Sequence, residues 1–119
     1  MTRDGFNTFC GGLKATTHVV QWGGSDVWKV GARVFAIGVP QGRTMLITFK
    51  TSPMSYDLLK DQPGLRPAPY LASRGLKWIQ HHGKPGLSDP DLRAYIVESH
   101  RLVVLGLSRR QHAELGLPI

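Results

Sequence analysis

The chain has 119 residues, of which 15 are Lys or Arg and 8 are Asp or Glu, so its formal net charge is +7. Its length predicts one domain over residues 1–119, and a hydrophobic content of 41% excludes a disordered polypeptide. A single cysteine excludes an internal disulfide framework, and no apolar run reaches the roughly 20 residues of a membrane span.

The first half of the chain predicts a short helix followed by an antiparallel meander. Residues 3–12 carry apolar side chains at helical spacing, and two glycines end the segment. Four strands are expected next, and the Gly31-Ala32 pair between two of them is typical of a two-residue hairpin turn. The expected strands are 18–22, 27–30, 33–39 and 44–50, with Pro40-Gln41-Gly42 as the turn before the last one.

Side-chain alternation in these strands predicts one apolar face that packs against helices. In the third strand, one face is expected to hold Phe35, Ile37 and Val39. In the fourth strand, the side chains expected to point inward are those of Met45, Ile47 and Phe49.

The second half of the chain predicts helices around further extended segments. Ser52-Pro53 is typical of a helix start, and this helix is expected to run to about residue 61 with Met54 and Leu58 on one face. Two prolines make residues 65–70 extended and exclude them from a central strand. A strand is expected at 76–81, a capped helix from Ser88 to about 105 with Leu92, Ile96, Ser99 and Val103 on one stripe, and a second capped helix from Ser108 to about 115. This order of elements predicts an α+β fold, an antiparallel sheet packed against helices.

The positive charge is concentrated in two stretches of the chain. Residues 27–56 and 62–88 hold four basic residues each and no acid, whereas the rest of the chain is nearly neutral. Such a distribution is typical of a surface that binds a polyanion, and nucleic acid is the polyanion expected; charge that only keeps the protein soluble is the alternative. The candidate nucleic-acid-binding residues are Lys29, Arg33, Arg43, Lys50, Arg66, Arg74 and Lys77.

Catalytic and metal-binding patterns are absent from the sequence. It contains no Gly-rich phosphate loop, no HExxH and no paired CxxC. Cys10 lies at helical spacing with Phe6 and Phe9, which is typical of a small buried side chain. We therefore expect a protein that is not an enzyme and uses no cofactor and no metal; a site assembled from Cys10 and distant histidines is the weaker alternative.

Aromatic residues lie within or beside the two basic stretches. They are Trp22, Trp28, Tyr70 and Trp78. Rings interleaved with cations are what a nucleic-acid surface uses for stacking, but the same rings can fill a core. Strand parity favours the core for Trp28, which shares a face with Val30. A further possibility is a groove beside the proline-flanked segment, with Trp28, Pro69, Tyr70 and Trp78 as candidate lining residues.

Three segments, in order, resemble the MmcQ/YjbR family. They are WGGSDVWKVGARVFA at 22–36, PGLRPAPYL at 63–71 followed by KWI at 77–79, and ESHRLVV at 98–104, where His100 stands in the place of a common Tyr. The resemblance implies an α+β fold like that of the bacterial frataxin homologue CyaY, described as a double wing, and a DNA-binding role without catalytic residues. An iron role like that of frataxins is not expected, because Asp4 is the one acid of the first helix.

The leading hypothesis is a DNA-binding protein that is monomeric or weakly dimeric. A cytoplasmic location is expected, since the start of the chain lacks the apolar segment of a signal peptide. Its basic sheet surface would contact mainly phosphates, so binding should be weakly specific and strongly dependent on salt. The alternative is a small-molecule or protein-interaction module with a groove near Arg66–Tyr70.

Overall fold

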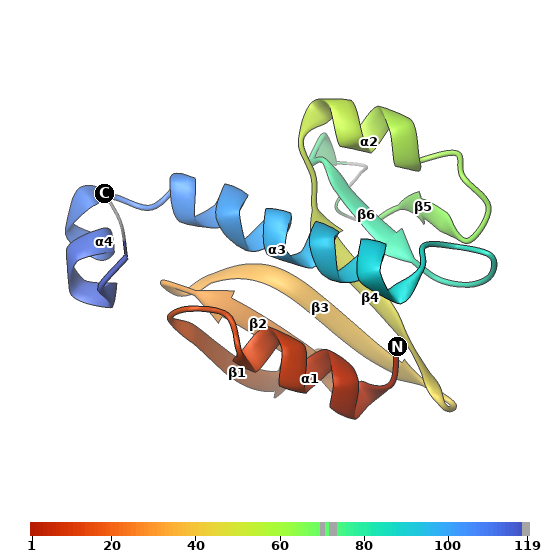
Figure 1. Ribbon diagram of the computed structural model, residues 1–119, viewed down its shortest axis with the longest axis horizontal. Helices are drawn as coiled ribbons and strands as arrows, with labels where there is room; N and C mark the ends of the chain where they lie inside the picture. The colour runs from red at the N-terminus through yellow and green to blue at the C-terminus, as the bar shows by residue number, and fades with distance from the viewer. Residues whose placement is uncertain (70, 72–73, 118–119) are drawn as a thin grey trace.

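Four helices and six strands are formed by the residues that the structure, a computed structural model, describes: 1–69, 71 and 74–117. Figure 1 shows them along the chain. The helices are α1 (Arg3–Gly11), α2 (Pro53–Leu59), α3 (Asp89–Leu105) and α4 (Arg109–Leu115). The strands are β1 (Thr16–Gln21), β2 (Ser25–Val30), β3 (Arg33–Gln41), β4 (Thr44–Lys50), β5 (Leu65–Pro67) and β6 (Trp78–His81).

The strands form one antiparallel sheet in the order β1-β2-β3-β4-β6-β5. The predicted meander occupies its first four positions, and the predicted α+β class is confirmed. β5 lies at the edge of the sheet, a position that suits its proline, Pro67, because proline has no backbone N–H to donate to a neighbouring strand. Gly31 and Ala32, with φ of 57° and 65°, form the predicted two-residue turn. The predicted end of the third strand is wrong by two residues. A turn was expected at Pro40-Gln41-Gly42, but β3 continues through Gln41.

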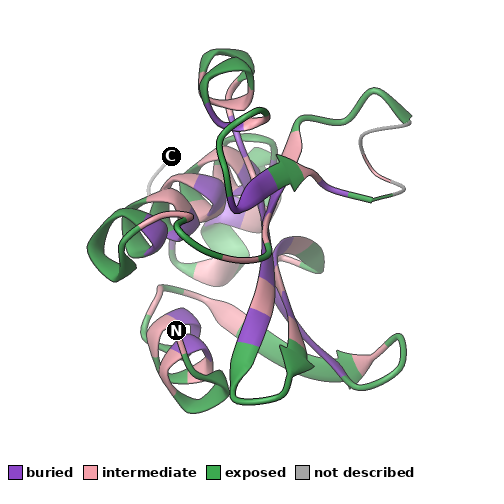
Figure 2. Cartoon of the chain, turned by 90° about the vertical axis from the view of Figure 1, so that its right-hand side faces the viewer, coloured by how far each residue is buried: buried purple, intermediate pink, exposed green. Residues whose placement is uncertain are grey.

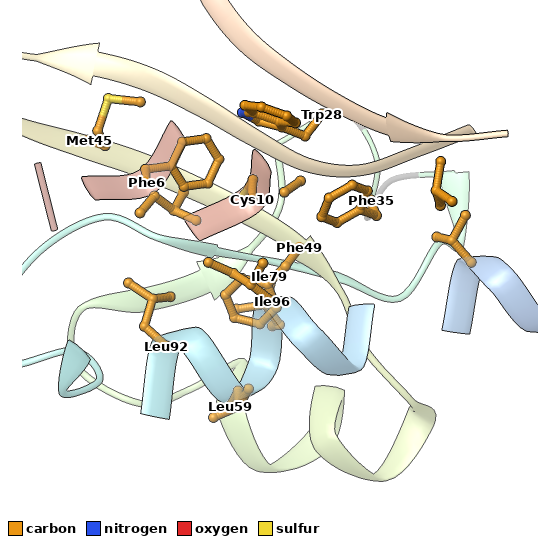
Figure 3. Packing of buried hydrophobic residues seen from close by; sticks show 14 of the residues in the cluster. Phe6, Cys10, Trp28, Phe35, Met45, Phe49, Leu59, Ile79, Leu92 and Ile96 are labelled. Carbon is orange, nitrogen blue, oxygen red and sulfur yellow. The ribbon is translucent and has the colours of Figure 1, made fainter. Parts of the chain in front are cut away.

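α1 and α3 cover one face of the sheet (Figure 1). The core between them contains Phe6, Phe35, Phe49 and Ile96, all fully buried (Figure 3). Gly38 allows α1 to approach β3, because a Cβ at this position would collide with Phe6. Colouring by burial shows the buried positions in the middle of the fold, where strands and helices meet (Figure 2).

A β-bulge in β3 decides which side chains reach this core. The pairing with β2 shifts between Trp28 and Lys29, so that Phe35 is the extra residue and both Phe35 and Ala36 are buried against the helices. Beyond the bulge the alternation is reversed, and Ile37 lies on the opposite face. The prediction that Phe35, Ile37 and Val39 share a face is therefore wrong. In β4, which has no bulge, the predicted inward set is confirmed.

The helices begin at the predicted caps. The side chains of Ser52, Ser88 and Ser108 each accept a hydrogen bond from a backbone N–H of the first turn. The buried stripe predicted for α3 is confirmed. α2 differs from the prediction, since it ends at Leu59 and buries that residue, whereas Met54 and Leu58 are exposed. No helix in the described ranges is both long enough and apolar enough to cross a membrane.

Candidate nucleic-acid interface

The face of the sheet opposite α1 and α3, called the open face below, holds three of the candidate cations. Its central row, Val27, Ile37, Thr48, Gln80 and Arg66, follows from the paired residues of neighbouring strands. Lys29 and Lys50 stand two residues further along their strands, and side chains at this spacing point to the same side. Lys29, Lys50 and Arg66 are therefore brought together on one surface.

Two of the other candidates point to the helix side. Arg33 pairs with the fully buried Val30, and its guanidinium lies near Gly106 at the end of α3. The ammonium group of Lys77 lies 4.7 Å from the centre of the Tyr56 ring on α2. The candidate cations thus do not form one surface.

Arg43 and Arg74 occupy connections rather than strands. Arg43 lies in the β3–β4 turn, and Arg74 lies in the connection between β5 and β6. Both are charged groups at the border of the sheet.

Acidic residues are absent from the open face. Asp26 is the one acid within the strands described, and it points to the helix side, where it meets Arg3 of α1. The other seven acids lie in the helices or in the turn after α2. Five of the eight acids form ion pairs, yet none of these pairs uses a candidate cation. In the described part of the chain, the three cations of the open face therefore have no acid beside them, whereas the acids lie on the helix side or beyond the sheet.

A groove with a volume of about 520 Å³ crosses the open face. Its floor combines apolar side chains, Ile37 and Leu46, with polar ones from β4, β5 and β6. One wall is the connection after β5, including Pro69, and the other includes Trp22 from the β1–β2 turn. The groove is lined by Arg66, Ala68 and Pro69, which belong to the segment near which a groove was hypothesised.

Arg66 is held in place on the floor of this groove. Its Nε and Nη2 atoms donate to Oε1 of Gln80 at 2.8 and 2.5 Å. The Gln80 amide donates in turn to Oγ1 of Thr48 at 3.4 Å. Gln80 and Thr48 are buried, whereas Arg66 is exposed. The chain of hydrogen bonds fixes the plane of the guanidinium, and among the described residues its Nη1 group has no partner.

Trp22 lines the groove, although sequence reasoning named it only among the aromatics of the basic stretches and not among the groove residues. Its side chain is 62% exposed, and its φ of 52° is in the left-handed region, which is uncommon for a large residue. Gly23 and Gly24 follow with positive φ, and the Ser25 hydroxyl donates to the Trp22 carbonyl at 3.1 Å. A signal for it existed in the sequence, since a tryptophan next to two turn glycines has no strand neighbours to bury it.

The other proposed groove residues have different positions. Trp28 is on the helix side, 8% exposed, where its indole N–H donates to Asn7 Oδ1 at 2.9 Å, so its predicted burial is confirmed and its place in a groove is wrong. Trp78 is half-buried and pairs with Lys50 on the open face, outside the lining of the groove. Tyr70 lies outside the described residues.

A second polar cluster lies between α1 and the β1–β2 hairpin. Asp26 is fully buried, receives two hydrogen bonds from Arg3 at 2.8 and 3.2 Å, and lies 2.9 Å from Nε2 of His18. Burial opposes the charge, but the hydrogen bonds from Arg3 and His18 outweigh it and hold the pKa of Asp26 below its usual value. The cluster joins α1 to the hairpin.

Cys10 lies in the hydrophobic core. Burial raises the pKa of the fully buried Cys10 thiol to about 12, which is the reverse of what an activated nucleophile needs. Within the residues described, no group of three His, Cys, Asp or Glu side chains is placed to hold a metal ion. Two further cavities, one of about 550 Å³ between α1 and Arg93 and one of about 310 Å³ beside His81, lie away from the open face.

An antiparallel sheet with helices on one face and a groove on the other places the chain in a class of α+β proteins with an open sheet face. The sequence model of the YjbR family matches residues 11–102, and the chain belongs to this family. The expected membership is thus confirmed.

The fold is similar to that of a solved structure, the crystal structure of Deinococcus radiodurans protein DR2400, which is described as a DUF419 domain. The TM-score is 0.83, the sequences are 21% identical, and the match covers 98% of this chain and 89% of that chain. No curated protein matches the sequence. At this identity the similarity concerns the fold alone.

Proposed function

We propose that the protein binds nucleic acid, DNA in the first instance, with the phosphate backbone against the open face of its sheet. The observation that carries the proposal is the separation of charge: Lys29, Lys50 and Arg66 share a face without acids, and none of them is in an ion pair with an acid among the described residues. Cations that are not neutralised by neighbours attract a polyanion and release its counterions on contact.

The proposal is narrower than the set of seven cations taken from the sequence. Arg33 and Lys77 point to the helix side and have no place in such a contact. Phosphate contacts do not read sequence, and no helix lies on the open face to enter a major groove, so binding is weakly specific.

The first prediction uses two double variants of equal charge. Lys29→Gln with Lys50→Gln removes two open-face cations, whereas Arg33→Gln with Lys77→Gln removes two from the helix side. Fluorescence anisotropy of a labelled DNA over a series of salt concentrations gives log K against log[salt]. In the open-face variant, the magnitude of this slope should fall by about 2, because each lysine that no longer neutralises a phosphate lowers it by about 1. In the helix-side variant, the slope should stay close to that of the parent.

Equal effects of the two double variants would show that only net charge matters, and the open face would lose its role. Affinity that does not change with salt, or no binding at low salt, would refute nucleic-acid binding altogether.

The groove itself supports a second candidate function, a small-molecule or protein-interaction module. The supporting observation is its volume of about 520 Å³ with a partly apolar floor and a proline wall, a size typical of small-ligand sites. An apolar ligand would raise the melting temperature with little dependence on salt, which separates this candidate from the first.

A further inference from the structure

The open face combines two features that phosphate binding alone does not use. The groove floor is apolar at Ile37 and Leu46, and a phosphate gains nothing from apolar side chains. The rim bears Trp22, which is exposed although burial of its ring would stabilise the fold. Both features suit a flat, partly apolar group attached to an anionic chain.

The side chain of Trp22 is exposed to solvent and is not packed in the core. A bulky residue in the left-handed region is a local conflict with backbone preference, and such conflicts are concentrated at functional sites. The hydrogen bond from Ser25 and the buried neighbours at the start of β2 hold the turn in this conformation. The indole thus gives a preformed surface on which a ring can stack.

Arg66 supplies directed donors at the floor of the same groove. Gln80 and Thr48 fix its guanidinium plane, and its Nη1 group is without a partner among the described residues. A planar guanidinium in this state can donate to the edge of a nucleobase or to a phosphate. Lys29 and Lys50 flank the floor two residues along β2 and β4, where the neighbouring phosphates of a bound strand would lie.

The size of the groove selects between paired and unpaired bases. Its volume of about 520 Å³ suits one nucleoside-sized group and is far too small for a duplex. In a duplex the bases are stacked inside, and only the phosphates and groove edges reach a protein. A base enters this groove only from a strand in which it is unpaired.

We propose that the groove receives an unpaired base of single-stranded DNA, stacked on Trp22 and hydrogen-bonded by Arg66, while Lys29 and Lys50 neutralise the adjacent phosphates. This inference rests on the proposed function and adds the state of the DNA, single-stranded, and the residues that recognise it. Charge complementarity favours this occupant, since the face has cations and an aromatic ring but no acid.

The test compares a labelled single strand of about 12 nucleotides, within the usual site sizes of single-strand-binding surfaces, with a duplex of the same length. The single strand should bind more tightly. Trp22→Ala should weaken single-strand binding about 5- to 150-fold, the range of one base–aromatic stack, while Trp22→Phe should retain most of the affinity. The salt dependence should stay unchanged in both variants, because no charge is removed.

Two further variants distinguish the loss of a binding contact from a loss of folding. Leu105→Ala changes an equally exposed apolar side chain at the end of α3, away from the groove, and should not alter binding. Arg66→Lys keeps the charge but removes the planar donor fork, so it should weaken single-strand binding without altering the salt dependence. Melting temperatures report whether each variant folds.

The outcomes separate the two proposals. Tight, salt-dependent binding of duplex with no preference for the single strand, or no effect of Trp22→Ala, would overturn the base-binding groove and leave the phosphate-binding face intact. Loss of duplex and single-strand affinity to the same extent in Trp22→Ala would also overturn it. Absence of binding to either DNA would overturn both.

Discussion

At the scale of single residues, charge is divided between groups that stabilise the fold and groups that remain available. Asp26 is buried and fully partnered by Arg3 and His18, whereas Lys50 and Lys29 have no acid within reach among the described residues. A buried carboxylate is tolerated only with such partners. Asp26 is therefore a structural charge, and it gives the protein a measurable dependence on pH.

The Asp26 prediction concerns stability in acid. Because its pKa is lowered in the folded state, its contribution is fully present above the unfolded-state pKa of about 3.9 and is lost as the pH falls below that value through the folded pKa. Asp26→Asn should lower the free energy of unfolding by about 1–3 kcal/mol at neutral pH and reduce the further loss below pH 4. Urea unfolding across a pH series measures both.

The control for Asp26→Asn is Asp4→Asn, which removes one negative charge from an exposed position of α1. Two results would contradict a structural role of Asp26. One is an equal loss of unfolding free energy in the two variants, and the other is a loss of stability below pH 4 that is as steep in Asp26→Asn as in the parent.

At the scale of elements, the docking of α3 on the sheet depends on one buried hydroxyl. Ser99 Oγ donates to the Phe35 carbonyl at 2.6 Å and accepts from the Lys50 N–H at 2.8 Å. Phe35 is the bulged residue of β3, and Lys50 ends β4. Ser99 therefore satisfies backbone groups where the ladder is interrupted, and it holds the strand that carries Lys50 against the helix.

The Ser99 prediction follows from these two bonds. Ser99→Ala should lower the free energy of unfolding by about 1–3 kcal/mol, because a buried N–H and C=O lose their partner. Ser55→Ala, the same change on α2 at a hydroxyl with no hydrogen bond in the described ranges, should leave stability close to that of the parent. Chemical denaturation compares them, and equal midpoints for both variants would contradict the assignment.

At the scale of the whole molecule, the sheet separates the side covered by α1 and α3 from the open face. The helices hold most of the acids and their ion pairs, and the open face holds the groove and three cations, Lys29, Lys50 and Arg66, that are in no ion pair among the described residues. In the proposed function, the three cations of the open face attract a polyanion to this side of the protein.

A map of amide shifts on titration with single-stranded DNA tests this arrangement. Shifts in a heteronuclear NMR spectrum should concentrate in β3, β4 and β6 and at Trp22, because these line the open face. The amide resonances of α3, which lies on the other face of the sheet, should not shift. Shifts centred on the cavity between α1 and Arg93 would assign binding to the wrong side and contradict the proposal.

Much of the fold was accessible from local sequence patterns. Serine caps, the Gly31-Ala32 turn and the alternation in β4 depend on residues close in the chain, so these predictions are confirmed. The bulge at Phe35 was not accessible, because it arises from pairing between two strands and is not marked by any local residue. A shift of one residue moves the following side chains to the other face, and Ile37 was misplaced for this reason.

By itself, the sequence determined the class of fold, the family and the two basic stretches of the chain. Only the tertiary structure decided which of these cations act together, because the face on which a side chain stands depends on the pairing of strands and on which side the helices cover. Lys50, Arg66 and Trp22 come from separate segments and meet through the β2–β3, β3–β4, β4–β6 and β5–β6 pairings, whereas Arg33 and Lys77, from the same basic stretches, point away.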